Sequence, residues 1–96
     1  MVLRSAQDYP ELYQTMEVLK QRARDSDARQ ILDNELKRAE ERLAEARKAY
    51  ANGEPEKQGI ESRNYQRYLD RVAELKDAVT RAENDVASIR RELQRL

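Results

Sequence analysis

The side chains of this 96-residue chain that could do chemistry are its carboxylates, its lysines and arginines, and five tyrosines. Histidine and cysteine are both absent, so the commonest general base and the thiolate nucleophile are missing. Zinc sites in proteins are rarely built without one of these two residue types. The sequence therefore predicts no catalytic residue, no metal site and no cofactor site, and we expect the chain not to be an enzyme.

Paired carboxylates are the constellation that most resembles acid and base machinery. Glu40 stands next to Glu41, and Asp25 lies two positions before Asp27. In a chain with 40% charged residues such pairs arise by chance, and no pocket-forming residues surround them. We interpret these pairs as parts of solvated helix faces. Asp77 and Arg81 have the acid-before-base spacing of four that stabilises a helix.

The charge pattern also excludes two classes of partner. The 19 basic and 19 acidic residues balance, and acids interrupt each basic run, as in KRAEER and RRELQR. Nucleic-acid binding needs a basic stripe or patch, so we expect no nucleic-acid partner. Since no stretch approaches 18 apolar residues and the N-terminus lacks the features of a secretory signal, we expect no membrane insertion.

The last third of the chain carries the most regular pattern. From residue 65 to 96 an apolar residue recurs at alternating intervals of three and four, the 3.5-residue period of a coiled-coil strand. Mostly charged and amide side chains fill the positions between. The apolar positions are Tyr65, Tyr68, Val72, Leu75, Val79, Ala82, Val86, Ile89, Leu93 and Leu96.

The first half of the chain has helical periodicity in two successive phases. Asp8 is a candidate N-cap followed by Pro10 and Glu11, which predicts a helix from about residue 9. The phases are offset by one residue, about 100° around a helix. The first phase is Leu12, Met16, Leu19 and Ala23, and the second is Leu32, Leu36, Ala39, Leu43, Ala46 and Tyr50.

Between the phases, the segment RDSDAR (residues 24–29) allows two interpretations. Asp27 with Gln30 resembles a second capping box, which would start a separate helix. Alternatively the helix continues with a polar interruption. We favour continuity because neither glycine nor proline occurs in residues 11–52.

The segment ANGEPEKQG predicts a loop between two long helices. Asn52-Gly53 suits a left-handed C-cap, Pro55 blocks continuation, and Ser62 or Asn64 can cap the next helix. We therefore predict a lead-in over residues 1–8, a helix over about 9–51, a loop over about 52–61 and a helix over about 62–96.

The predicted fold is all-α, an antiparallel two-helix coiled-coil hairpin. Two registers fit the loop, with Leu43 opposite either Tyr68 or Leu75. Tyr50, Tyr65 and Tyr68 are expected to close the core at the loop end. The predicted packing residues are Leu32, Leu36, Leu43, Tyr50, Tyr65, Tyr68, Val72, Leu75, Val79, Val86, Ile89 and Leu93.

Two packed helices bury the apolar positions of each helix only in part, so the hairpin is expected to self-associate. The simplest form is a homodimer that makes a four-helix bundle about a two-fold axis. Residues 9–23 extend beyond the length that a hairpin needs, and they form a candidate docking segment for a protein partner. Four further apolar residues lie off the main stripes: Val18, Ile31, Ile60 and Leu69.

Two segments together resemble a known protein group. They are ARQILDNELKRAEERLAEARKAYANGEP (residues 28–55) and RNYQRYLDRVAELKDAVTRAENDVASIRREL (residues 63–93). They are similar to the C-terminal helical hairpin of proteobacterial, mostly exported proteins that carry an N-terminal domain of unknown function and a proline-rich linker. The resemblance implies a periplasmic or cell-envelope location, no known activity, and a chain that is a fragment of a larger protein. If the resemblance does not hold, a cytoplasmic location is expected.

The expected function is that of a structural or interaction module, a coiled-coil hairpin that self-associates or docks a partner protein. The alternative is a small all-helical enzyme of the chorismate-mutase type, which works with Arg, Lys and Glu in a dimeric bundle. The present helices lack that family's first-helix pattern, and the polar groups near the seam, Arg29 and Gln30, do not converge with others.

Overall fold

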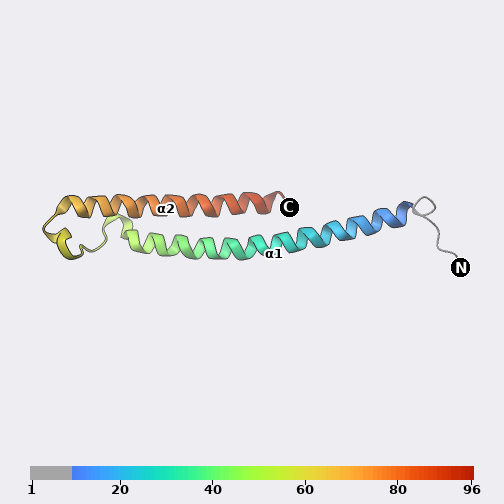
Figure 1. The fold of residues 1–96 in the computed structure, drawn as a ribbon, viewed down its shortest axis with the longest axis horizontal. Coiled ribbons are helices and arrows are strands. Elements are labelled where there is room, and N and C mark those ends of the chain that lie inside the picture. Colours follow the sequence, from blue (N-terminus) through green and yellow to red (C-terminus); the bar gives the residue numbers. More distant parts are fainter. Residues whose placement is uncertain (1–9) are drawn as a thin grey trace.

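The computed structural model describes residues 10–96, with side chains from residue 14 onward. Two long helices lie side by side and antiparallel, α1 (Pro10–Tyr50) and α2 (Tyr65–Gln94), as Figure 1 shows. Two short 3₁₀ turns, η1 (Ala51–Gly53) and η2 (Gly59–Ser62), lie in the connection. The predicted all-α helical hairpin is confirmed.

Helix α1 runs without a break through residues 24–29, so the predicted continuity is confirmed. This segment contains neither glycine nor proline, and the lower helix propensity of Asp25, Ser26 and Asp27 costs at most about 0.7 kcal/mol per residue. The predicted first cap at Asp8 and the neighbouring Tyr9 lie outside the described residues, as does the side chain of Tyr13. The observed end at Tyr50 is one residue from the predicted end.

The C-terminal end of α1 is turned by left-handed backbone, as Asn52-Gly53 predicts. Ala51, Asn52 and Gly53 have φ values of 50°, 54° and 86°. Glycine and asparagine adopt this region readily, whereas alanine does so at a cost. A Cβ atom on Gly53 would lie 3.2 Å from the hydroxyl oxygen of Tyr50, so the position is also tight.

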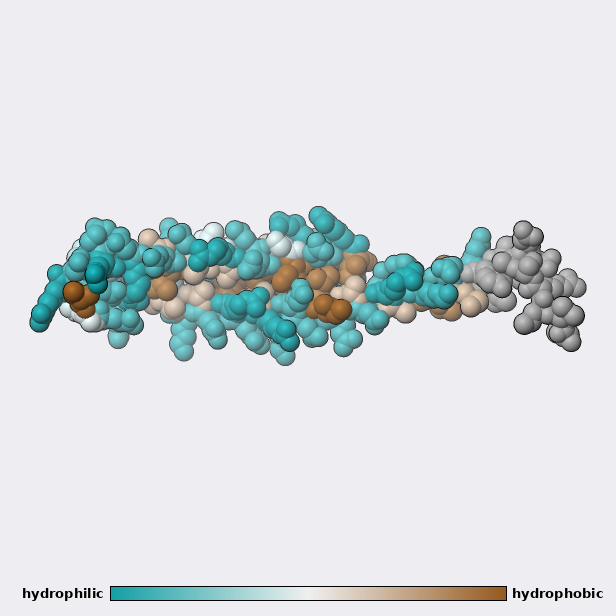
Figure 2. All heavy atoms as spheres, in the orientation of Figure 1, coloured by the Kyte–Doolittle hydropathy of each residue, from teal (hydrophilic) through white to brown (hydrophobic). Residues whose placement is uncertain are grey.

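The core is a thin layer between the two helices. Its buried apolar residues are Ala39, Leu43, Val79 and Val86. Ala39, only 1% exposed, lets the helices approach closely. Half-buried neighbours complete the layer: Leu36, Ala46, Tyr50, Ala82 and Ile89. Figure 2 shows hydrophobic residues gathered between the helices, with hydrophilic residues above and below.

Neither predicted register is correct. Two ion pairs connect the helices, Arg47 with Glu83 at 3.8 Å and Glu40 with Arg90 at 3.3 Å. A step of seven residues toward the N-terminus of α1 therefore corresponds to a step of seven residues toward the C-terminus of α2. Leu43 lies between the two pairs and clusters with Val79 and Val86, further along α2 than Tyr68 or Leu75. The reason is that α2 begins beyond the end of α1, and its first turns pack on the connecting loop (Figure 1).

The opposite end of α1 extends past the C-terminus of α2 (Figure 1). Every described side chain from residue 14 to 27 is exposed. We call residues 14–27 the arm and residues 28–96 the body. In line with its lack of a facing helix, the arm is the narrow part of the molecule in Figure 2.

Candidate interaction site

Eleven of the twelve predicted packing residues lie wholly or partly inside the hairpin. Those that are buried are Leu43, Val79 and Val86. Those that are half-buried are Leu32, Leu36, Tyr50, Tyr68, Val72, Leu75, Ile89 and Leu93. The alternating three-and-four spacing of apolar residues therefore identified the packed face of both helices.

Tyr65 is the exception, since it is 59% exposed and closes no core. The prediction fails because the first turn of α2 has no part of α1 opposite it. Tyr65 instead stacks on Tyr68 with ring centroids 5.9 Å apart, and the ammonium group of Lys57 lies 5.2 Å from the centre of its ring. The other two tyrosines do close the loop end, Tyr50 against the core and Tyr68 against the loop.

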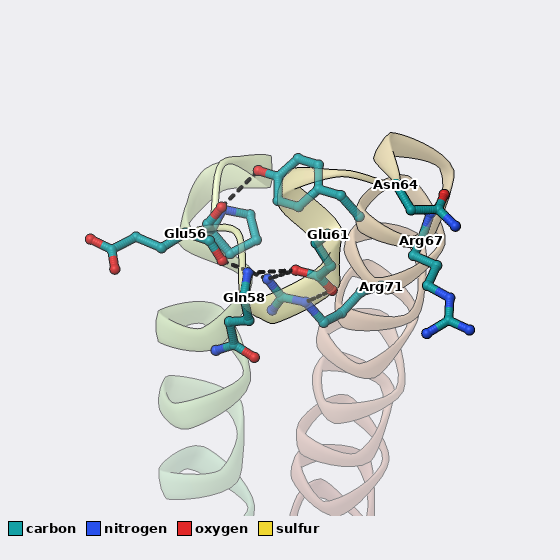
Figure 3. Close-up of polar contacts among 8 residues, drawn as sticks. Glu56, Gln58, Glu61, Asn64, Arg67 and Arg71 are labelled. Atoms are coloured by element: carbon teal, nitrogen blue, oxygen red, sulfur yellow. Dashed lines mark hydrogen bonds and ion pairs between the residues drawn. The ribbon is translucent and has the colours of Figure 1, made fainter.

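The loop end of the hairpin carries the densest polar network among the described residues. Glu61 accepts two hydrogen bonds from the guanidinium of Arg71, from Nε at 2.7 Å and from Nη2 at 3.0 Å. The backbone N–H of Gln58 also donates to Glu61, at 2.9 Å, as part of a capping box around η2. Figure 3 shows this carboxylate held between the loop and α2. The bidentate geometry is the strong form of an Arg–carboxylate pair.

Further bonds fix the loop to the first turns of α2. Arg71 donates to the carbonyl oxygen of Glu56 at 2.6 Å, and the hydroxyl of Tyr68 donates to the carbonyl oxygen of Pro55 at 2.7 Å (Figure 3). Asn64, one of the two predicted caps, accepts the backbone N–H of Arg67 at 3.3 Å. These contacts explain why α2 starts so far beyond α1: the loop itself is its packing partner.

The electrostatics of this network favour the charged pair. The hydrogen bond from Arg71 lowers the pKa of Glu61, the bond from the Gln58 backbone lowers it further, and desolvation opposes both. Glu61 in turn raises the pKa of Arg71. Each charged group therefore stabilises the charged form of the other. The network is a structural clamp, and we call Glu61, Arg71 and Tyr68 with their loop partners the clamp.

Sequence reasoning missed the clamp, although one signal for it exists. Gln58 and Glu61 have the spacing of a capping box, which predicts a short helical turn inside the segment we treated as loop. The partner Arg71 lies ten positions after Glu61, and no local pattern links residues at that distance.

The arm presents the other candidate site. Met16, Val18 and Leu19 are 45%, 49% and 57% exposed. A shallow surface depression on this segment is lined by Gln14, Thr15, Val18, Leu19 and Arg22. Within that lining, positions 15, 18, 19 and 22 form the four-residue diamond that receives a side chain from a neighbouring helix in a coiled coil. The arm therefore presents an exposed, partly apolar helix surface.

Two classes of site are not found among the described residues. Over residues 10–96, neither helix is long and apolar enough to cross a membrane. Within the same part of the chain, no group of three or more acidic side chains is placed to hold a metal ion.

A scan against family models, a search of curated proteins and a search of solved structures find no match to this chain. The resemblance to exported proteobacterial proteins, with the envelope location that it implies, stays a prediction.

Proposed function

We propose that this chain is a non-catalytic interaction module, in which the body is a rigid support and the arm is the binding element. The observation that carries the proposal is the exposure of Met16, Val18 and Leu19 on a helix with nothing packed against it. Apolar side chains clustered on one exposed segment are typical of a protein–protein contact. Helix-in-groove and helix-on-helix binding both use such a stripe.

The surface of the body supports the proposal, because its exposed apolar residues form no continuous stripe. Its exposed large apolar residues are scattered over both helices and the loop: Ile31, Ile60, Tyr65, Leu69 and Leu96. A four-helix bundle through the body needs an apolar stripe that recurs along the outer face of a helix. These five residues form no such repeat, so the arm is the better supported site of association.

Self-association is the first activity to test. Sedimentation equilibrium of the full chain over a wide concentration range should show a species heavier than the 11.3 kDa monomer. The variant Met16→Glu/Leu19→Glu should remain monomeric, since each glutamate would place a charge in the contact. Ile31→Glu is the matched control, because Ile31 is 59% exposed but lies in the body. A wild-type chain that stays at monomer mass throughout would reject self-association.

A further inference from the structure

We propose that four charged side chains select the register of the hairpin and thereby set how much of α1 extends beyond α2 as the arm. They are Glu40 and Arg47 on α1 and Glu83 and Arg90 on α2, joined in the two ion pairs between the helices. On each helix the two residues are seven positions apart, so they occupy the same position in successive heptads. This selection acts within one chain and is independent of what binds the arm.

The apolar core distinguishes poorly between neighbouring registers. Ala39 directly precedes Glu40, and Val86 lies one helical turn before Arg90, so these two buried residues pack beside that ion pair. If α2 moved seven residues toward the arm, each apolar residue on the packed face of α1 would still meet an apolar residue. In this shifted register Leu32, Leu36, Ala39, Leu43 and Ala46 would meet Val86, Ala82, Val79, Leu75 and Val72. The cost to the core is confined to the last turns of α2, which would face the polar residues 24–29.

The charges, in contrast, match only in the observed register. Arg47 lies 3.8 Å from Glu83, and Glu40 lies 3.3 Å from Arg90. All four side chains are 48–61% exposed, so each pair adds little to stability by itself. Charges beside the core of a coiled coil act mainly by favouring one alignment of the helices over another.

A shift of α2 by seven residues toward the arm would bring like charges together at both contacts. Arg47 would face Lys76, and Glu40 would face Glu83. Like charges in facing positions destabilise a helix pair, and this repulsion disfavours the shifted register. This register is also one of the two that the loop length allows, so the charges supply the information that loop length lacks.

A shift by seven residues in the opposite direction, toward the loop, would place Arg47 opposite Arg90. Arg47 therefore meets a base in both neighbouring registers and an acid only in the observed one. The shift toward the arm would gain one favourable contact, Asp33 with Arg90, against its two unfavourable ones. The register that is observed is thus the one of the three with opposite charges at every contact of Glu40 and Arg47.

The variant Arg47→Glu/Glu83→Arg tests the proposal, because it removes the selection and keeps the ion pairs. In the observed register both contacts still join an acid to a base, with the first pair reversed. Both α1 positions are then acidic, and positions 76, 83 and 90 of α2 are all basic, so the neighbouring registers also gain opposite charges. The variant should remain helical and should occupy more than one register. Glu74→Arg/Arg81→Glu is the matched control, since it exchanges two exposed charges that are likewise seven residues apart on α2.

Distances between two nitroxide labels, one on each helix, measure the register. The natural chain has no cysteine, so Lys48→Cys and Gln94→Cys place the labels at exposed positions of the full chain. Dilution with unlabelled chain removes distances between molecules. A shift of one heptad changes the separation of the labels along the helix axis by about 10 Å, seven residues at 1.5 Å each. The natural charges and the control should give one distance, and Arg47→Glu/Glu83→Arg should give a second distance as well.

The clamp is the competing source of register, and Glu61→Gln weakens it. Natural charges combined with Glu61→Gln should still give one distance, and a second distance there would overturn the proposal, because the clamp would then set the register. A second distance for Arg47→Glu/Glu83→Arg, with the clamp natural or weakened, supports selection by charge. The natural distance alone in both backgrounds would overturn it, as would two distances in the natural chain.

Discussion

At the scale of single residues, the hairpin depends on few side chains. Four apolar residues are buried, and Leu43 is the largest contributor from α1. Leu43→Ala should lower the free energy of unfolding by about 2–3 kcal/mol, the lower part of the usual range, because a thin layer can partly collapse around the missing atoms. Urea denaturation followed by circular dichroism measures this change. Leu69→Ala, at a 41% exposed position, is the control and should change stability by less than about 0.5 kcal/mol.

The clamp predicts a particular pH dependence. Because Arg71 lowers the pKa of Glu61 in the folded state, ionised Glu61 stabilises the fold. This stabilisation is complete above the ordinary carboxyl value of 4.5 and is lost as pH falls through the lowered folded-state pKa. The natural chain should therefore lose stability on acidification. The variant Glu61→Gln should be less stable than the natural chain at pH 7 and should lose less stability than the natural chain as the pH falls.

Thermal unfolding of both proteins over a pH series checks this prediction. Glu56→Gln is the control, since only the backbone carbonyl of Glu56 takes part in the clamp. If natural protein and Glu61→Gln lose stability in parallel as pH falls, the carboxylate of Glu61 does not contribute in the expected way. The sequence could not reveal this contribution, because the distance between Glu61 and Arg71 is set by the folded loop.

At the scale of elements, local patterns predicted most of what the structure contains. The alternating intervals of three and four predicted both packed faces, and the Asn52-Gly53 pair predicted the end of α1. The register was the main error. It was derived from loop length alone, and the loop uses its residues to form η2 and to cover the first turns of α2. Loop length does not determine register when the loop folds on itself.

The turn at the end of α1 predicts opposite effects for two neighbouring substitutions. Gly53→Ala should destabilise the hairpin by about 1 kcal/mol or more, because φ is 86° and the added Cβ would crowd Tyr50. Ala51→Gly should stabilise it by up to about 1 kcal/mol, because Ala51 has a φ of 50° that glycine adopts without strain. Chemical denaturation of the two variants gives the signs, and equal signs would contradict this account of the turn.

At the scale of the whole molecule, the sequence predicted a docking segment and a homodimer, and both stay predictions. Residues 9–23 were predicted as a docking segment, and the part of them that the structure describes in full is exposed. The four-helix bundle was predicted from the expectation that a thin core needs further packing partners, and it stays a prediction. How far α1 extends beyond α2 depends on the register, so this length could not be derived from periodicity.

The proposed association through the arm predicts a thermodynamic signature in the intact molecule. A fold stabilised by its own oligomerisation unfolds at a temperature that rises with protein concentration. The natural chain should show this rise, and Met16→Glu/Leu19→Glu should unfold at a temperature independent of concentration. Scanning calorimetry at several concentrations measures both. A concentration-independent midpoint for the natural chain would show that folding and association are not linked.

The unbroken course of α1 through arm and body has a mechanical consequence. Because one continuous helix supplies both segments, a molecule that binds the arm in a fixed orientation also fixes the orientation of the body. A pull on the arm is carried into the body by consecutive backbone hydrogen bonds of the same helix, without an intervening joint. A molecule of this shape can set the distance between two attachments as well as connect them.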